Sequence, residues 1–178
     1  MGTPMELVSS PNEVECSDTE QSSCIVLRVY PKDIRRLWPF IKFGLIDMKP
    51  LLADGDPDYV NSVLRGLLSG RMHIWVGYSE AEKDQYRLDG FIITYIISSP
   101  SLSGARQLYI YALYSYGTLT MDQIAIGQKC IEELARDERC SHIRAEVDFG
   151  VMDSWVTGLG LGYKKAWVTV QKEVPYAR

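Results

Sequence analysis

The sequence predicts an α/β fold with a mixed, mostly antiparallel sheet flanked by helices. Runs of β-branched and aromatic residues follow one another through the middle of the chain with short polar connections, which is typical of antiparallel strands. Apolar residues recur at helical spacing before and after that block, which predicts helices that cover the sheet. The 178 residues, 46% apolar and 24% charged, have the size and composition of one globular domain.

The first 23 residues differ from the rest in composition. They are rich in Ser, Glu, Asp, Pro and Thr and hold almost no apolar residue after Val8, so burial cannot offset the entropy cost of ordering them. We therefore expect a flexible arm over residues 1–23 and a folded domain over residues 24–178.

The first expected strand spans residues 24–30, because a β-branched run ends there at Pro31. Apolar residues then recur at helical spacing over 34–41, where Pro39 predicts that the helix is kinked or divided in two. A further helix begins at an Asp-Pro pair and ends at a glycine, over residues 56–70.

Residues 72–78 and 88–97 form an expected hairpin, with the charged segment 79–87 as its connection. After a Ser/Pro/Gly loop at 98–104, residues 107–114 form the next antiparallel strand. Its alternating pattern leaves open which face is buried.

An apolar stripe from Met121 to Ala135 predicts the clearest helix of the chain. A half-buried strand is expected over 141–148, followed by a short helix over 151–161 that glycines end. Residues 166–170 close the fold as a last strand.

Charge and apolar runs exclude two classes of partner. The net charge is −4 and no Lys/Arg cluster is present, so we expect no nucleic acid partner. The longest apolar runs fall far short of the roughly 20 residues that cross a bilayer, and the N-terminus shows neither a signal peptide nor a myristoylation motif. We expect no membrane association and a cytoplasmic location.

Cysteine and histidine usage predicts no metal site. The cysteines lack the paired spacing of zinc ligands and the density of a disulfide scaffold, so reduced thiols are expected. The two histidines lie in apolar alternating stretches that favour structural roles. These residues are Cys16, Cys24, Cys130, Cys140, His73 and His142.

Two segments carry a resemblance to a known family. Residues 133–148 look like a helix followed by the pattern G-C-x-x-I/L-x-L-x-V, and residues 161–164 look like an L-G-F-K turn before a last strand. Together with the element order, they make residues 24–174 resemble the GNAT (acetyltransferase-like) fold family, with small bacteriophage-encoded members closest. The resemblance implies a GNAT-like sheet and, in an active member, acetyl-CoA as acyl donor.

The loop that holds CoA in this family has lost its usual residues here. Family members carry Arg/Gln-x-x-Gly-x-Gly/Ala at a helix N-terminus, where glycines let backbone amides approach the pyrophosphate. The matching positions are Leu119, Thr120, Asp122 and Ile124, which supply neither a cation nor a glycine. Thr120 is then an N-cap with Asp122 and Gln123 in the first helical turn.

The alternative is an atypical phosphate loop in which backbone amides of 117–123 alone hold the pyrophosphate. The cofactor contacts would then come from Leu113, Tyr114, Thr120, Met121, Asp122 and Gln123.

The family's catalytic signatures are also absent. Gly158 stands at the position of the common general-acid tyrosine, and Val151 stands where an asparagine is usual. Tyr114, Glu146 and Asp148 remain candidates for a general base, although each residue type is more often a solvated strand-end residue.

These observations favour a GNAT-fold protein with a degenerate acyl-CoA site that binds a protein partner or a second copy, with no cofactor, in the cytoplasm of a host cell or in a virion. The alternative hypothesis is an acetyl-CoA-dependent N-acyltransferase. Four tyrosines between Tyr109 and Tyr116 indicate either an aromatic contact surface or plain strand propensity.

Overall fold

One sheet holds every strand of the part of the chain that the computed structural model describes, residues 24–50, 56–82, 85–98 and 105–146. Its order is β1-β2-β3-β4-β5. Among the described strands, the β4–β5 pair is parallel and the β1–β2, β2–β3 and β3–β4 pairs are antiparallel. This confirms the predicted mixed, mostly antiparallel sheet. The strands are β1 Cys24–Val29, β2 Met72–Glu82, β3 Gln85–Ser98, β4 Arg106–Ser115 and β5 Cys140–Ala145.

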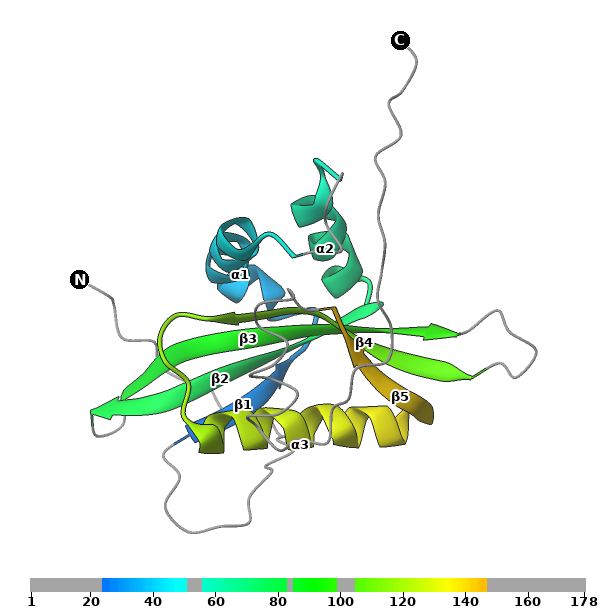
Figure 1. Ribbon diagram of the computed structural model, residues 1–178. Helices are drawn as coiled ribbons and strands as arrows, with labels where there is room; N and C mark the ends of the chain where they lie inside the picture. The colour runs from blue at the N-terminus through cyan, green and yellow to red at the C-terminus, as the bar shows by residue number, and fades with distance from the viewer. Residues whose placement is uncertain (1–23, 51–55, 83–84, 99–104, 147–178) are drawn as a thin grey trace. The chain divides into compact units, whose positions relative to one another are not determined.

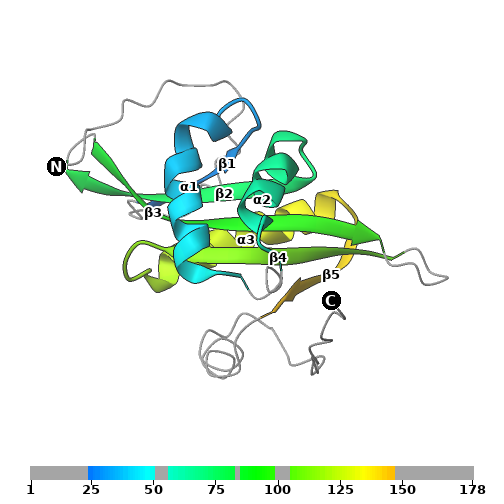
Figure 2. The same ribbon diagram turned by 90° about the horizontal axis from the view of Figure 1, so that it is seen from above.

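Three helices within the described ranges cover the two faces of this sheet (Figure 1, Figure 2). Helices α1 (Ile34–Met48) and α2 (Tyr59–Leu68) pack side by side on one face, and α3 (Met121–Asp137) lies on the other. A parallel neighbour requires a crossover connection, and α3 provides it between β4 and β5. The predicted arm at 1–23, the helix at 151–161 and the strand at 166–170 lie outside the described residues.

Helix α1 continues through Pro39, so the expected division into two short helices is wrong. A proline inside a helix removes the hydrogen bond between its own nitrogen and the carbonyl four residues earlier. Here that carbonyl belongs to Arg35, and both Arg35 and Pro39 are exposed, which lets water satisfy the freed group. Burial of Leu37 and Ile41 on either side of Pro39 holds the helix together.

The hairpin strands are longer than the apolar runs alone suggest. Residues 79–82 and 85–87 belong to β2 and β3, with Ser79 opposite Arg87 and Glu82 opposite Gln85. The segment 79–87 is therefore mostly paired strand, which corrects the expectation of a connecting segment. Strands that leave the core can expose both faces to water, so their side chains need not alternate in hydropathy.

The main core lies between the sheet and the α1/α2 layer. Its buried residues come from both helices and from β2, β3 and β4: Ile34, Leu37, Ile41, Leu45, Val63, Leu67, Ile74, Val76, Tyr78, Phe91, Ile93 and Ala112. A second buried set lies outside this cluster and includes the apolar stripe of α3: Trp75, Leu108, Ile110, Cys130, Ile131, Leu134 and Ala135.

Four register shifts interrupt the pairing of the described strands, and two of them concern Asp89 and Tyr111. Gly77 pairs with Gly90 while Tyr78 pairs with Leu88, which leaves Asp89 without a partner in β2. Ile93 pairs with Ala112 and Thr94 with Ile110, which leaves Tyr111 unpaired in the same way. Such bulges re-aim a side chain that regular alternation would send elsewhere.

Helix α1 approaches the sheet closely at Gly44. A Cβ atom there would lie 2.6 Å from the Cε1 atom of Phe91 and 2.7 Å from the Cδ1 atom of Tyr114. The Phe91 and Tyr114 rings also stack on each other, so moving either ring to make room for a methyl group would cost packing energy.

We predict that Gly44→Ala destabilises the fold by about 1–3 kcal/mol, because overpacking outweighs the gain of up to about 1 kcal/mol in helix propensity. The midpoint of urea unfolding measures this change. The control is Gly77→Ala, since a Cβ at Gly77 meets nothing within 4 Å. Equal midpoints for the two variants would contradict the close approach.

Candidate functional site

Strand β4 runs past its parallel neighbour. It pairs with β5 only from Arg106 to Ile110, yet it continues to Ser115. Among the described residues, no strand pairs with the edge of residues 111–115 on the β5 side (Figure 2). Backbone donors and acceptors on such an edge can bond to water or to an extended ligand.

The open edge begins at the Tyr111 bulge. The Tyr111 ring packs against the core under α1 and α2 and makes an edge contact with Tyr95, with ring centroids 6.2 Å apart. Burial, with a smaller contribution from the Asp56 carboxylate, raises the pKa of Tyr111 to about 12. The phenol is therefore neutral at physiological pH and serves as a hydrogen-bond donor or acceptor rather than a base.

The open edge leads directly to the start of α3, where Thr120 and Gln123 form a capping box. The backbone N–H of Gln123 donates to Thr120 Oγ1 at 3.2 Å, and the backbone N–H of Thr120 donates to Gln123 Oε1 at 2.7 Å. The predicted N-cap role of Thr120 is confirmed. The box engages two of the amides at the helix start, which leaves those of Met121 and Asp122 outside it.

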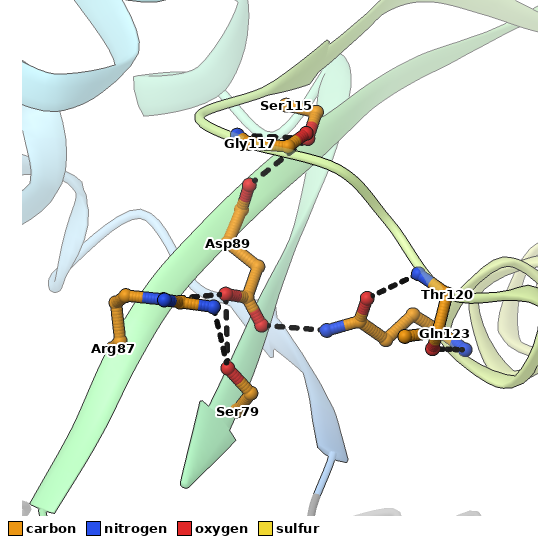
Figure 3. A network of polar contacts seen from close by, with 7 residues as sticks. All are labelled: Ser79, Arg87, Asp89, Ser115, Gly117, Thr120 and Gln123. Atoms are coloured by element: carbon orange, nitrogen blue, oxygen red, sulfur yellow. Dashed lines mark hydrogen bonds and ion pairs between the residues drawn. The ribbon is translucent and has the colours of Figure 1, made fainter. Parts of the chain in front are cut away.

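Asp89 ties this helix start to the sheet (Figure 3). Its carboxylate accepts from Gln123 Nε2 at 2.7 Å, from Ser79 Oγ at 3.0 Å and from Arg87 Nε at 3.1 Å. Its backbone carbonyl accepts from the amide of Tyr116 at 2.8 Å. Only 6% of the Asp89 residue is exposed, so these bonds compensate the desolvation of a buried charge.

The loop between β4 and α3 has a polar contact of its own. Ser115 Oγ donates to the carbonyl of Gly117 and, at 3.4 Å, to the carbonyl of Asp89 (Figure 3). The loop is therefore attached to β3 at Asp89 and to α3 at Gln123. Its shape is set by side chains rather than by a run of glycines.

Two carboxylates lie near this helix start, and one of them, Asp89, is paired with the Arg87 guanidinium. Asp122 lies in the first turn of α3, and the Asp89 carboxylate lies one side chain away through Gln123. Asp122 favours the positive end of the helix dipole and would repel a diphosphate, whereas the charge of Asp89 is offset by Arg87. The positions of the family's loop, Leu119 to Ile124, thus hold a capped helix N-terminus.

Tyr114 and Tyr116 fasten α1 to the sheet. Tyr114 Oη donates to Asp47 Oδ2 at 2.8 Å, and Tyr116 Oη donates to the carbonyl of Phe40 at 2.7 Å. The bond to Asp47 raises the pKa of Tyr114, and burial raises the pKa of Tyr116 to about 12. Both remain neutral phenols, which does not suit Tyr114 to the general-base role considered from the sequence.

The other candidate residues do not converge on one point. Leu113 pairs with Ile92, which approaches Gly127 of α3, so Leu113 belongs to the sheet face opposite Tyr114. Glu146 is exposed just after β5. Asp148, Val151, Gly158 and the 161–164 turn lie outside the described residues.

Burial shifts the pKa of two described thiols and of one described imidazole. Burial raises the pKa of the Cys24 and Cys140 thiols. Burial, assisted by Arg28, lowers the pKa of His73, whose Nδ1 lies 2.7 Å from Arg28 Nη2. The described residues contain no group of three or more potential metal ligands, and none of their helices is long and apolar enough to cross a membrane.

Sequence reasoning missed Asp89 and Asp47. The signal for Asp89 is the Asp-Gly pair inside an otherwise apolar strand, because a turn-type dipeptide within a strand indicates a bulge. Asp47 offers no such signal, since a single acidic residue on a helix is most often solvated.

Solved structures of acetyltransferases share this fold. A ribosomal-protein-alanine N-acetyltransferase from Brucella melitensis biovar Abortus 2308 is 13% identical over 85% of this chain and 99% of that chain, with a TM-score of 0.57. A predicted acetyltransferase with acetyl-CoA from Clostridium acetobutylicum is 19% identical over 83% and 96%, with a TM-score of 0.56. The aminoglycoside N-acetyltransferase AAC(6')-Iy in complex with CoA is 9% identical over 88% and 98%, with a TM-score of 0.61.

Neither a protein-family model nor a curated protein sequence matches the chain. At these identities the likeness establishes the fold alone. The chain has the GNAT acetyltransferase fold, which confirms the architectural part of the resemblance.

The capping box yields a stability prediction. We expect Thr120→Ala to cost about 1 kcal/mol by loss of the cap, and Gln123→Ala about 2 kcal/mol because it also leaves the buried Asp89 carboxylate short of a donor. Asp122→Asn, the control, should change stability by only a few tenths of a kcal/mol. Urea unfolding measures all three, and a Gln123→Ala effect no larger than that of Asp122→Asn would refute the role of the network.

The tyrosines yield a pH prediction. The folded pKa values of Tyr111 and Tyr116, about 12, lie above the usual value of about 10. Their contribution to stability is therefore fully present below about pH 10 and is lost as pH rises towards 12. Tyrosinate absorbance of the folded protein should show a late phase that Tyr116→Phe reduces. In urea-unfolded protein this phase should disappear, and its absence from the folded protein would contradict the burial of both phenols.

Proposed function

We propose that this chain is an acetyl-CoA-dependent N-acyltransferase with an atypical pyrophosphate loop. The observation that carries the proposal is the open edge of β4 from Tyr111 to Ser115, which leads into the N-terminus of α3. The pantetheine arm of CoA carries amide groups that can extend such a strand edge by backbone hydrogen bonds. That the solved acetyltransferases share the fold gives further support.

Acyl transfer from a thioester to an amine requires few charged side chains. The amine nitrogen attacks the thioester carbonyl carbon, a C–N bond forms, the C–S bond breaks, and the proton lost from the amine balances the one taken up by the thiolate. Backbone amides at the β4 edge would stabilise the negative charge that develops on the carbonyl oxygen. The O–H of Tyr114 already donates to Asp47, so Tyr114 has no second proton for the reacting groups, and a carboxylate or water must accept the amine proton.

Acetyl-CoA would fit the site unevenly along its length. The β4 edge suits the pantetheine and acyl parts, because both can form hydrogen bonds with backbone N–H and C=O groups. The α3 start suits the diphosphate less well, since the capping box and Asp122 take the places of glycines and a cation. Within the capped turn, the amides of Met121 and Asp122, assisted by the helix dipole, would contact the phosphates.

A second candidate function follows from that same helix start. The capping box, the carboxylate of Asp122 and the loss of the family's catalytic residues at Val151 and Gly158 favour a non-catalytic binding or structural module. This is the role implied by the resemblance to small phage-encoded members of the fold. Its partner would be another protein or a second copy, and the protein would then bind no CoA.

Calorimetric titration of the full chain with acetyl-CoA separates the two functions. Micromolar binding, followed by thiol release from acetyl-CoA in the presence of a panel of primary amines, would support the acyltransferase. No heat of binding at millimolar acetyl-CoA would instead favour the non-catalytic module.

Removing the carboxylate beside the phosphates tests the atypical loop. We predict that Asp122→Asn tightens acetyl-CoA binding by roughly two- to tenfold, because one repulsive charge is lost. The matched control is Asp137→Asn at the far end of α3, which makes the same charge change away from the site and should leave the affinity unaltered. If both variants bind alike, the diphosphate does not lie at the start of α3.

A further inference from the structure

Three aromatic rings beside the open end of β4 form three walls. The rings of Phe43 and Tyr116 are nearly parallel, with 19° between their planes and centroids 6.5 Å apart. The Tyr114 ring stands nearly perpendicular to both, at 80° to Phe43 and 82° to Tyr116, with centroids 6.4 Å and 5.0 Å away. We call these three rings, together with the carboxylate of Asp47, the aromatic box.

Two of the walls are fixed from behind. The Tyr114 ring stacks on Phe91, with centroids 5.6 Å apart, and lies against Gly44. Tyr116 is held by its hydrogen bond to the carbonyl of Phe40. The third wall, Phe43, comes from α1 and is 59% exposed, so it leaves the box accessible from solvent. Preorganised rings lose little entropy when a ligand enters.

The charge of the box is negative. Asp47 Oδ2 accepts from Tyr114 Oη at 2.8 Å, and a carboxylate retains further lone pairs after one such bond. The faces of neutral aromatic rings attract cations, and a carboxylate adds a full negative charge. Both groups disfavour anions, while a neutral ligand would gain only the apolar contact.

Stacked and edge-to-face contacts hold the three rings together. They leave much of Phe43 open to solvent, so part of its apolar surface can still gain by contact with a ligand. Its neighbour one turn earlier, Phe40, is also 48% exposed. The position of the box, on the strand whose edge is offered to the acyl donor, places its occupant beside the reacting centre.

We propose that the aromatic box binds a primary alkylammonium group, the end of the amine that accepts the acyl group. Its role as the acceptor site rests on the proposed acyltransferase function, but its affinity for an ammonium group does not. The ammonium contacts the ring faces of Phe43, Tyr114 and Tyr116 and pairs with the Asp47 carboxylate.

The test compares n-butylammonium with n-butanol, which has the same alkyl chain and no charge, by NMR titration of the full chain without donor. We expect millimolar binding of n-butylammonium and at least tenfold weaker binding of n-butanol. Asp47→Asn should weaken n-butylammonium binding at least fivefold, and Phe43→Leu at least twofold. Asp33→Asn, at the other end of α1, should leave it unchanged.

Urea unfolding of each variant verifies that it is folded, which the exposure of Asp47 and Phe43 favours. Equal binding of n-butanol and n-butylammonium, or an Asp47→Asn variant that binds as well as the original chain, would overturn the proposal. Nα-acetyl-lysine methylamide, titrated in parallel, identifies the source of the ammonium. Tighter binding than n-butylammonium supports a lysine side chain of a polypeptide, and equal binding supports a small amine.

Activity measurements separate this inference from the proposed function. If n-butylammonium binds in the aromatic box but no amine is acylated with any acyl donor, the ammonium site is supported and the acyltransferase function is refuted. If amines are acylated and Asp47→Asn leaves their KM unchanged, the acyltransferase function is supported and the aromatic box is refuted as the acceptor site. A raised amine KM in Asp47→Asn with kcat largely retained supports both.

Discussion

The buried carboxylate of Asp89 joins three segments that are distant in the sequence. It accepts hydrogen bonds from the β2–β3 hairpin through Ser79 and Arg87 and from α3 through Gln123. Through its backbone carbonyl, Asp89 also holds the chain as it leaves β4. A buried charge destabilises a fold strongly unless its bonds are made. The hairpin register, the β4–α3 loop and the start of α3 are therefore set together.

The bulge makes this connection possible. Leu88 packs against the α1/α2 core and Phe91 belongs to it, although residues three apart on a regular strand would face opposite sides. Skipping Asp89 in the pairing with β2 resolves that conflict and sends its carboxylate towards α3. Gly90 completes the arrangement, because a Cβ there would collide with the carbonyl of Tyr114.

The two sides of β4 serve different purposes. Towards α1, Tyr114 in β4 and Tyr116 just after it bind the helix through Asp47 and the carbonyl of Phe40. Along its edge beyond Ile110, its backbone is free of strand partners among the described residues. The tyrosine-rich stretch is therefore more than strand propensity: Tyr114 and Tyr116 shape a surface, while the Tyr95 and Tyr109 rings stack on each other, 5.4 Å apart, farther along the sheet.

Much of the fold could be predicted from periodicity, because strands and helices with one buried face repeat at 2.0 and 3.6 residues. The capping box was also predictable, since Thr120 and Gln123 interact within one turn. The prediction that Pro39 divides the helix was wrong because the effect of a proline depends on whether the freed carbonyl is exposed to water. That exposure is set by the tertiary structure. The aromatic box could not be predicted, since Phe43 and Tyr114 are 71 residues apart in sequence and meet only where Gly44 lets α1 touch the sheet.

The bulge at Tyr111 has a consequence for solubility. An exposed strand edge can recruit a strand from another molecule and start aggregation. In β4 the bulge interrupts regular pairing at the point where the open edge begins, so an intruding strand from another copy would find only residues 112–115 in uninterrupted register. Such a short segment is a poor template for a second molecule, yet it is long enough for a small extended ligand.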